Sequence, residues 1–457
     1  MSKVTPARMI ACDAFVEVME KKRKPDDVLE EFYEKNSAEL KRIDKNLTKE
    51  ILFGGLRWYK KIFWILQQTS TRDLTKLSPQ VRAALVLGTY QIFYMDRVPE
   101  RAAVNEAAEY MKAKKELGAV GFVNGILRQI ARRAEYFAKP DKKKQAVEYL
   151  ALQFSHPDWL VHRWLPRFGF EKMEVMLMAN NQPPPIHIRI NSLRTPIENV
   201  RDVQDNLLRE EHIHSERISA KSGLLLKKHP DVGQESQFGS GLFTFQDQAS
   251  QLIPLLMDIK EGDVILDAAA GPGGKFSHIY ELGKGNITLI GVEKDALQMQ
   301  RAKETMNRLH PQNKAIWHEL DFAELKLEQK VDKILLDAPC TGLGVLRRHP
   351  EGKWHKDSSG ISTLAATQRK LITHALTLLR SGGELTYSVC SFEPEETEDH
   401  LHWLKSEFKD KIEIISPVSR LPDYFKRYVT RDNILMIYAG NQDDMDGFGA
   451  FCVKWKG

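Results

Sequence analysis

Cysteine is scarce in this chain, with four residues in a length of 457, and this scarcity excludes several classes of protein. Four cysteines are too few for a disulfide scaffold, and no CxxC pair offers the spacing of a structural metal site. We therefore expect no bound metal. Each cysteine needs its own explanation, with a buried and inert thiol as the default. The four are Cys12, Cys340, Cys390 and Cys452.

Long apolar runs are also missing from the sequence. No stretch of about 18 or more uncharged apolar residues occurs, and the opening MSKVTPARMIACDAF lacks the blocks of a signal peptide. We expect no membrane span, a cytoplasmic location and a monomer. Apolar residues make up 42% of the chain, enough for real cores, and the length predicts two to three domains.

Acidic residues are under-represented only in the N-terminal part. The first 144 residues carry 29 Lys and Arg against 19 Asp and Glu, whereas the whole chain carries 67 against 62. This local excess indicates a nucleic-acid contact, because basic side chains neutralise phosphates. Solvated helix faces explain the charge equally well. The basic clusters lie at 21–24, 132–133 and 142–144.

The N-terminal region has the texture of a helical domain, which we place at residues 1–138. Apolar residues recur at spacings of three and four, without alternating runs. Ser78 and Pro79 form an N-cap and a first-turn proline ahead of one such helix. The charged segment 138–144, which contains a proline, is a candidate linker.

The rest of the chain predicts two α/β regions. Residues 145–240 contain short mixed elements, including a helix near 159–165 and a strand-like IHIRI, and predict a small α/β domain. Residues 241–457 alternate buried strands with helices, the rhythm of a doubly wound, mostly parallel sheet of the Rossmann-like kind. Its strands are expected at 264–268, 287–292, 315–318, 333–336 and 384–388.

A glycine-rich turn marks the expected cofactor site. The strand VILDA leads directly into the glycine-rich segment 271–275 and then into a helix, so a ligand can approach the backbone at this edge of the sheet. Glu293, at the end of the second strand, is placed to accept hydrogen bonds from ribose hydroxyls. These features alone fit both a dinucleotide and S-adenosylmethionine.

Two further carboxylates favour S-adenosylmethionine. Asp321 follows the third strand and Asp337 the fourth, so both are expected around the same crevice. A pyrophosphate would be repelled there, whereas a sulfonium cation would be attracted. The alternative is that these carboxylates cap helices.

Two of the four cysteines converge on this site. Cys340 follows the fourth strand in LLDAPC, and Cys390 follows the fifth in LTYSVC. Consecutive strands usually lie side by side, so both thiols are expected at the ligand-binding edge. Cys12, on a helical apolar stripe, and Cys452, in a terminal apolar strand, fit the inert default.

Paired thiols suit methylation of carbon 5 of cytosine. That carbon is too weak a nucleophile to attack a methyl sulfonium until a thiolate adds at C6. An acid near N3, such as Asp337, would stabilise the adduct, and a second thiol could assist proton removal or release. The base must also leave its stack or lie in a single strand.

The same motifs resemble those of bacterial ribosomal RNA cytosine-5 methyltransferases of the RsmB (Sun, Fmu) type, within the RsmB/NOP family. The matching segments are QDQASQL (246–252), LDAAAGPGGK (266–275), DAPCTGLGVLRRHPEGKW (337–354), TYSVCSFEPEE (386–396) and DGFGAF (446–451). At the N-terminus, RMIACDAF, VNEAAEY and FVNGILRQIARR resemble the RNA-binding helical protein NusB, and SHPDWLVHRW fits the subgroup's middle domain. The resemblance implies small-subunit (16S) ribosomal RNA as substrate, with RNA-binding roles for residues 1–138 and 145–240.

The resemblance also implies individual roles. Cys390 corresponds to the nucleophile and Cys340 to the cysteine that releases the product, while Lys275 would lie near the methionine end of the cofactor or the target base. Two positions depart from the family pattern: CAAPGGK begins here with Ala269, and the second-strand Asp is Glu293. The implied cofactor-binding residues are Ala269, Ala270, Gly271, Pro272, Gly273, Gly274, Lys275, Glu293, Asp321 and Asp337.

Three other functions share parts of this pattern. A DNA cytosine-5 methyltransferase would transfer the nucleophilic role to Cys340, which follows a proline. An amino-group methyltransferase would need an Asn/Asp-Pro-Pro-aromatic motif, where this chain has DAPC. A non-catalytic RNA assembly factor could retain the fold without using the thiols.

Overall fold

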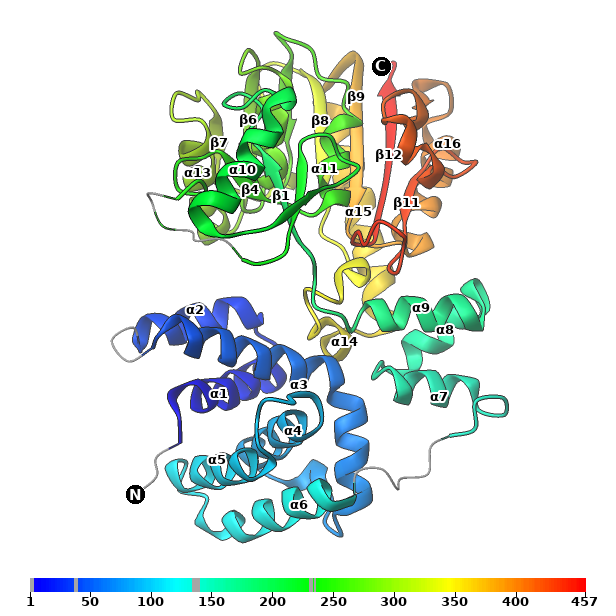
Figure 1. Cartoon of the computed structure of the whole chain (residues 1–457). Coiled ribbons are helices and arrows are strands. Elements are labelled where there is room, and N and C mark those ends of the chain that lie inside the picture. The colour runs from blue at the N-terminus through cyan, green and yellow to red at the C-terminus, as the bar shows by residue number, and fades with distance from the viewer. Residues whose placement is uncertain (1–3, 37–39, 134–139, 230–232, 234–235) are drawn as a thin grey trace. The chain divides into compact units, whose positions relative to one another are not determined.

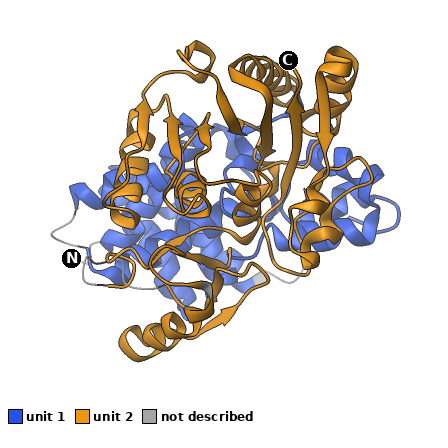
Figure 2. Ribbon diagram, turned by 90° about the horizontal axis from the view of Figure 1, so that it is seen from above, with its two compact units in different colours: residues 1–183, 346–358 blue, residues 184–345, 359–457 orange. Residues whose placement is uncertain are grey.

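The computed structural model describes residues 4–36, 40–133, 140–229, 233 and 236–457. It contains two compact units, which Figure 2 colours separately. Unit 1 comprises Met1–Pro183 with Leu346–Ser358, and unit 2 comprises Pro184–Val345 with Ser359–Gly457. Within the described ranges, no helix is long and apolar enough to cross a membrane.

Unit 1 is helical, and Figure 1 shows its elements in blue through cyan to blue-green, with α14 in yellow. Its helices are α1 (Pro6–Lys21), α2 (Pro25–Lys35), α3 (Arg42–Thr69), α4 (Pro79–Tyr94), α5 (Glu100–Ala113), α6 (Val120–Arg133), α7 (Ala146–Gln153), α8 (Asp158–Phe168), α9 (Phe170–Ala179) and α14 (Gly352–His355). The expected start of α4 is confirmed: Ser78 Oγ accepts a hydrogen bond from the Val81 amide at 3.4 Å. The candidate linker begins outside the described residues.

The core of unit 1 is built by α1, α3, α4, α5 and α6, whose buried side chains include Phe15, Leu52, Leu87 and Leu127. The apolar periodicity in the sequence therefore marks the faces on which these helices pack.

A segment from the C-terminal part of the chain, 346–358, completes unit 1. Trp354 packs against the helical core, and the Lys353 side chain is buried. The Lys353 ammonium donates to the carbonyl oxygen of Arg57 at 3.2 Å, that of Ser155 at 3.2 Å and Asn181 Oδ1 at 2.5 Å. One buried lysine thus joins three separate stretches of this unit.

Unit 2 contains a small antiparallel sheet in the order β2-β3-β1-β4. Its elements are β1 (Ile186–Ile190), α10 (Val200–Glu211), β2 (Ser215–Arg217), β3 (Gly223–Leu226) and β4 (Phe243–Phe245). The expected strand IHIRI is β1, at the centre of this sheet. Apolar side chains such as Ile188, Val203 and Phe243 form its core with α10.

The larger sheet of unit 2 has the order β10-β12-β9-β8-β5-β6-β7, with β11 paired to β12. Strands β5 to β9 are parallel to their neighbours among themselves, whereas β12 runs antiparallel to β9. The strands are β5 (Val264–Asp267), β6 (Thr288–Val292), β7 (Ile316–His318), β8 (Val331–Asp337), β9 (Leu379–Val389), β10 (Ile412–Ile415), β11 (Leu435–Ile437) and β12 (Phe448–Trp455). The helices are α11 (Gln248–Leu255), α12 (Gly274–Leu282), α13 (Ala296–Leu309), α15 (Ser358–Leu378) and α16 (Glu398–Phe408).

The order of the strands locates the ligand-binding edge. Chain order runs one way from β5 through β6 to β7 and the other way from β8 to β9, so it reverses between β5 and β8. In open α/β sheets, ligands bind beyond the carboxyl ends of the strands at such a reversal. All five strands expected for this sheet are confirmed as β5 to β9.

Candidate active site

Two thiols lie side by side where β8 and β9 end. These strands are parallel, and Asp337 pairs in register with Ser388 near their carboxyl ends. The segments that follow emerge at one edge, where the Sγ atoms of Cys340 and Cys390 are 3.2 Å apart. Both side chains are half-buried. The adjacency expected from strand order is confirmed.

The environment of Cys340 opposes its ionisation. The hydrogen bond with Cys390, followed by burial and the nearby negative charges, raises the pKa of the Cys340 thiol well above its usual range. Two sulfur atoms in contact cannot both carry a negative charge without strong repulsion. Cys340 is therefore protonated at neutral pH.

Beside the thiols, Lys275 and Asp337 form an ion pair. Lys275 Nζ lies 2.7 Å from Asp337 Oδ2, and Ser388 Oγ donates to Asp337 Oδ1 at 2.6 Å. Burial alone would lower the pKa of Lys275, but the Asp337 carboxylate and the sulfur of Cys390 raise it above its ordinary value. The Lys275 ammonium also lies 5.3 Å from the centre of the Phe448 ring. A cation is thus fixed at the edge that carries the thiols.

The glycine-rich turn connects β5 to α12 in a conformation that needs glycine. Gly271 and Gly273 have φ angles of +51° and +87°, which L side chains rarely adopt. A Cβ atom on Gly273 would also lie 3.0 Å from Ala302 Cα. Glu293 Oε2 accepts the Gly271 amide at 3.0 Å, so the acid at the end of β6 supports the turn directly.

A carboxylate that the sequence analysis did not select lies under this turn. Asp267, the last residue of β5, is buried, and its Oδ1 accepts the Ala269 amide at 3.3 Å. Its Oδ2 has no hydrogen-bond partner among the described residues. Burial, and to a lesser degree the charges of Asp337 and Glu293, raises the pKa of Asp267 to about 7. The sequence feature that could have identified Asp267 as a site residue is the acid that ends the apolar strand VILDA.

Asp321 takes the geometry of a helical cap. Its Oδ1 accepts the Ala323 amide at 3.0 Å at the start of a short 3-10 helix, Phe322–Glu324, and Oδ2 lies 3.5 Å from Lys294 Nζ. The capping alternative is therefore present in the structure. A role for Asp321 in binding a cofactor remains a prediction.

The backbone after Cys340 is held by another acid that the sequence analysis missed, the buried Glu396. Its Oε1 accepts the Thr341 amide at 2.8 Å and Gln368 Nε2 at 3.0 Å, and Oε2 accepts the Thr341 hydroxyl. Gln368 Oε1 in turn accepts a hydrogen bond from His400 Nε2 at 2.8 Å. This network fixes the loop that carries one of the two thiols.

The other two cysteines are buried, as expected for the inert default. Cys12 lies in the helical core of unit 1, where burial raises the pKa of its thiol. Cys452 lies in β12, where burial raises its pKa to about 11. Neither belongs to the group of side chains at the ends of β8 and β9 that contains Cys340 and Cys390.

The strand order, the reversal between β5 and β8 and the glycine-rich turn define a Rossmann-like domain in unit 2. The carboxylates and the paired thiols at its ligand-binding edge place it in the methyltransferase class. Comparison with known families identifies it further: the chain belongs to the 16S rRNA methyltransferase RsmB/F family, whose profile matches residues 254–450. The NusB family matches residues 5–132, and the RsmF/B-like ferredoxin-like domain matches residues 156–233.

Relatives of similar length support this assignment. The chain is 31% identical to "Probable ribosomal RNA small subunit methyltransferase B" of Bacillus subtilis (strain 168), over 100% of both chains. It is 33% identical to "Ribosomal RNA small subunit methyltransferase B" of Pasteurella multocida (strain Pm70), over 78% of both. The similarity thus spans the N-terminal, middle and C-terminal regions.

Solved structures share the fold at lower identity. The crystal structure of PH0851 superposes with a TM-score of 0.81 at 22% identity, covering 99% of both chains. A methyltransferase homolog protein from Pyrococcus horikoshii superposes with a TM-score of 0.56 at 24% identity, covering 68% of this chain and 99% of that one.

Proposed function

We propose that this chain transfers a methyl group from S-adenosylmethionine to carbon 5 of a cytosine in 16S ribosomal RNA. The observation that carries the proposal is the contact between Cys340 and Cys390, 3.2 Å apart, beside the ion pair of Lys275 and Asp337. Membership of the RsmB/F family supports the RNA substrate.

The residues around the glycine-rich turn fit S-adenosylmethionine. The unpartnered Asp267 Oδ2 is an acceptor available to an ammonium group, and Glu293 is an acceptor for hydroxyl groups. When bound, S-adenosylmethionine supplies an electrophilic methyl group. The proposed binding set is Asp267 together with Ala269, Ala270, Gly271, Pro272, Gly273, Gly274, Lys275, Glu293, Asp321 and Asp337.

The proposed chemistry at the base uses the two thiols unequally. The Cys390 thiolate would form a bond to C6, with Asp337 close to N3, and the C5–C6 electron pair would become available at C5. That pair would form the bond to the methyl carbon as the bond from this carbon to the sulfonium sulfur breaks, with S-adenosylhomocysteine as the leaving group. Loss of the C5 proton to a base then restores the double bond as the C6–sulfur bond breaks. Cys340, held protonated in contact with Cys390, stabilises the departing thiolate by donating a hydrogen bond to it.

The adduct experiment tests this assignment. The Cys340→Ala variant should accumulate a covalent enzyme–RNA complex that survives denaturing electrophoresis, because release lacks its second thiol. Cys390→Ala should form no complex and transfer no methyl group. Incubation with 16S ribosomal RNA and labelled S-adenosylmethionine measures both products.

Cys452→Ala is the matched control, since that thiol is buried in β12, outside the group of side chains that contains Cys340 and Cys390, and should leave turnover unchanged. A complex formed by Cys390→Ala and not by Cys340→Ala would reverse the two roles. Label found at an exocyclic amino group instead of C5 would refute the proposed reaction.

A further inference from the structure

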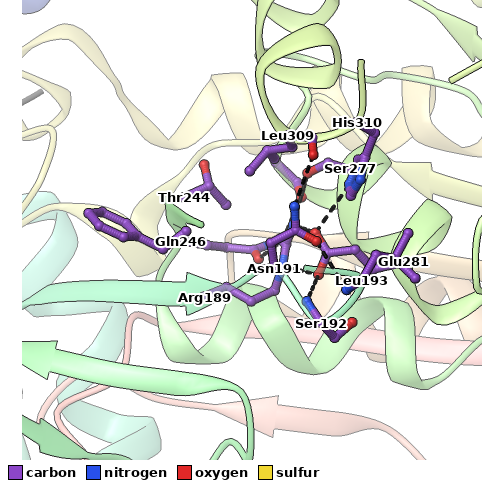
Figure 3. Close-up of polar contacts among 12 residues, drawn as sticks. Arg189, Asn191, Ser192, Leu193, Thr244, Gln246, Ser277, Glu281, Leu309 and His310 are labelled. Atoms are coloured by element: carbon purple, nitrogen blue, oxygen red, sulfur yellow. Dashed lines mark hydrogen bonds and ion pairs between the residues drawn. The ribbon is translucent and has the colours of Figure 1, made fainter. Parts of the chain in front are cut away.

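A fully buried arginine joins the small sheet of unit 2 to the helix that follows the glycine-rich turn. Arg189 lies on β1 with 0% of its surface exposed, and Figure 3 shows its side chain directed toward Ser277 and Glu281 of α12. An arginine has five N–H donors, and here each has an acceptor. The acceptors are Glu281 Oε1 at 2.7 Å, Glu281 Oε2 at 3.3 Å, Ser277 Oγ at 2.9 Å, the Gly274 carbonyl at 2.9 Å and Gln246 Oε1.

The Gly274 carbonyl is the contact with consequences for the site. Gly274 is the first residue of α12 and directly precedes Lys275, whose ammonium pairs with Asp337. Ser277 Oγ donates to the same carbonyl at 3.1 Å, so two side-chain donors converge on one oxygen. Arg189 thereby restrains the peptide unit between the glycines of the turn and Lys275.

Stability alone does not explain a charged pair in this position. Burial would raise the pKa of Glu281, but the Arg189 guanidinium lowers it to about 2, so the pair is fully charged. Removing two charges from water is costly, and apolar side chains of similar volume often join elements as well or better. What an apolar side chain could not do is hold the Gly274 carbonyl in one direction.

We propose that Arg189 is a positioning residue for the methyl donor: by fixing Gly274 it sets the shape of the turn, so the small sheet controls cofactor affinity. This inference rests on the proposed binding of S-adenosylmethionine at that turn. The motif QDQASQL takes part in the same hydrogen-bond network, because the Arg189 guanidinium donates both to Gln246 of this motif and to the Gly274 carbonyl.

The test compares two arginines that join the same small sheet to the large domain. Arg308, on α13, donates to the carbonyl oxygens of Phe238 at 2.7 Å and Phe243 at 3.0 Å. Arg308→Lys therefore weakens a similar junction without altering the bond to Gly274. Titration calorimetry with S-adenosylmethionine and thermal unfolding are measured on the full-length wild type, Arg189→Lys and Arg308→Lys.

Arg189→Lys should weaken S-adenosylmethionine binding about tenfold, the equivalent of ~1.4 kcal/mol. Its KM for S-adenosylmethionine should rise likewise, with KM for RNA unchanged. Arg308→Lys should lower the unfolding temperature about as much as Arg189→Lys does. It should nevertheless change the affinity for S-adenosylmethionine by less than about twofold. Equal losses of affinity in both variants, or no loss in Arg189→Lys, would overturn the inference.

Ser277→Ala provides a second variant should Arg189→Lys fail to fold. It removes one donor to the Gly274 carbonyl and the acceptor of one Arg189 N–H while retaining the Arg189–Glu281 pair. It should weaken binding severalfold, and unchanged binding would contradict the inference. Wild-type protein that binds no S-adenosylmethionine at all would instead contradict the proposed function.

Discussion

At the scale of single residues, Asp267 is a carboxyl group whose protonation couples to folding. Its pKa of about 7 in the folded chain lies above the ordinary value of 3.8. Between roughly pH 4 and 7 the folded state therefore holds a proton that the unfolded state has released, so this group makes stability fall as pH rises across that window.

Asp267→Asn should abolish that fall, since an amide does not titrate. Measured by urea unfolding without cofactor, the stability of the wild type relative to the variant should decrease by about 2–4 kcal/mol between pH 4 and 8. Asp410→Asn, at an exposed position, is the control. Curves for wild type and Asp267→Asn that stay parallel across the range would contradict this prediction.

Sequence reasoning predicted some site residues and missed others for identifiable reasons. The contact between Cys340 and Cys390 could be predicted because each thiol follows a strand marked by its own apolar residues, and consecutive strands usually lie side by side. Arg189 could not be assigned a role, because its partner Glu281 lies 92 positions away and nothing in IHIRI points to it. Asp267 carries a recognisable signal, an acid at the end of an apolar strand, but the strand pattern alone does not distinguish a site residue from the last residue of a strand.

At the scale of elements, the strands and helices that could be predicted are those whose buried residues form a regular apolar pattern in the sequence. Strands such as β8, which is largely buried along its length, were predicted from short apolar runs. Residues 346–358 lie within the sequence range 241–457 predicted for the C-terminal domain, and in the structure they pack in unit 1. Their side chains include an arginine pair, two histidines and a buried lysine, a composition without the periodicity that marks a core contact.

The loop between β8 and α15 offers a prediction at this scale. Glu396→Gln would place an amide N–H₂ group where Thr341 and Gln368 now donate to a carboxylate. Leaving buried donors unsatisfied should cost about 1–3 kcal/mol of unfolding free energy. Because the loop carries Cys340, the covalent RNA complex should also persist longer than in the wild type, as measured by its decay after a chase.

Asp399→Asn, an exposed change in neighbouring α16, is the matched control and should alter neither quantity. An adduct lifetime equal to that of the wild type, despite lower stability, would show that the network supports the fold without setting the position of Cys340.

At the scale of the whole molecule, the excess of basic residues in the first 144 positions should affect how strongly RNA binding depends on salt. Lys143 and Lys144 are exposed, with their backbone amides bound to Asp141. We expect both side chains to contact phosphates, so replacing both with alanine should flatten the salt dependence of RNA binding by roughly one unit of slope per contact. Fluorescence anisotropy with a 16S ribosomal RNA fragment between about 50 and 200 mM salt measures this slope.

Lys409→Ala with Lys411→Ala removes the same charge from an exposed turn of unit 2 and serves as the control. An equal slope change in both double variants would mean that net charge alone, without localisation to the N-terminal region, governs binding. Point substitutions are preferable to deleting residues 1–138, because deletion would remove the Arg57 carbonyl that the buried Lys353 contacts.

That lysine also bears on how the chain is made. Lys353 and Trp354 belong to the second segment of unit 1, Leu346–Ser358, whereas the first segment ends at Pro183. The ribosome therefore completes most of unit 1 long before it adds the segment 346–358. At ~5–20 residues per second, the delay is on the order of 10–30 s. During that interval the acceptors on Arg57, Ser155 and Asn181 lack the hydrogen bonds that Lys353 donates to them in the complete chain. The N-terminal unit thus reaches its final form only after synthesis has passed Cys340, the first thiol of the proposed active site.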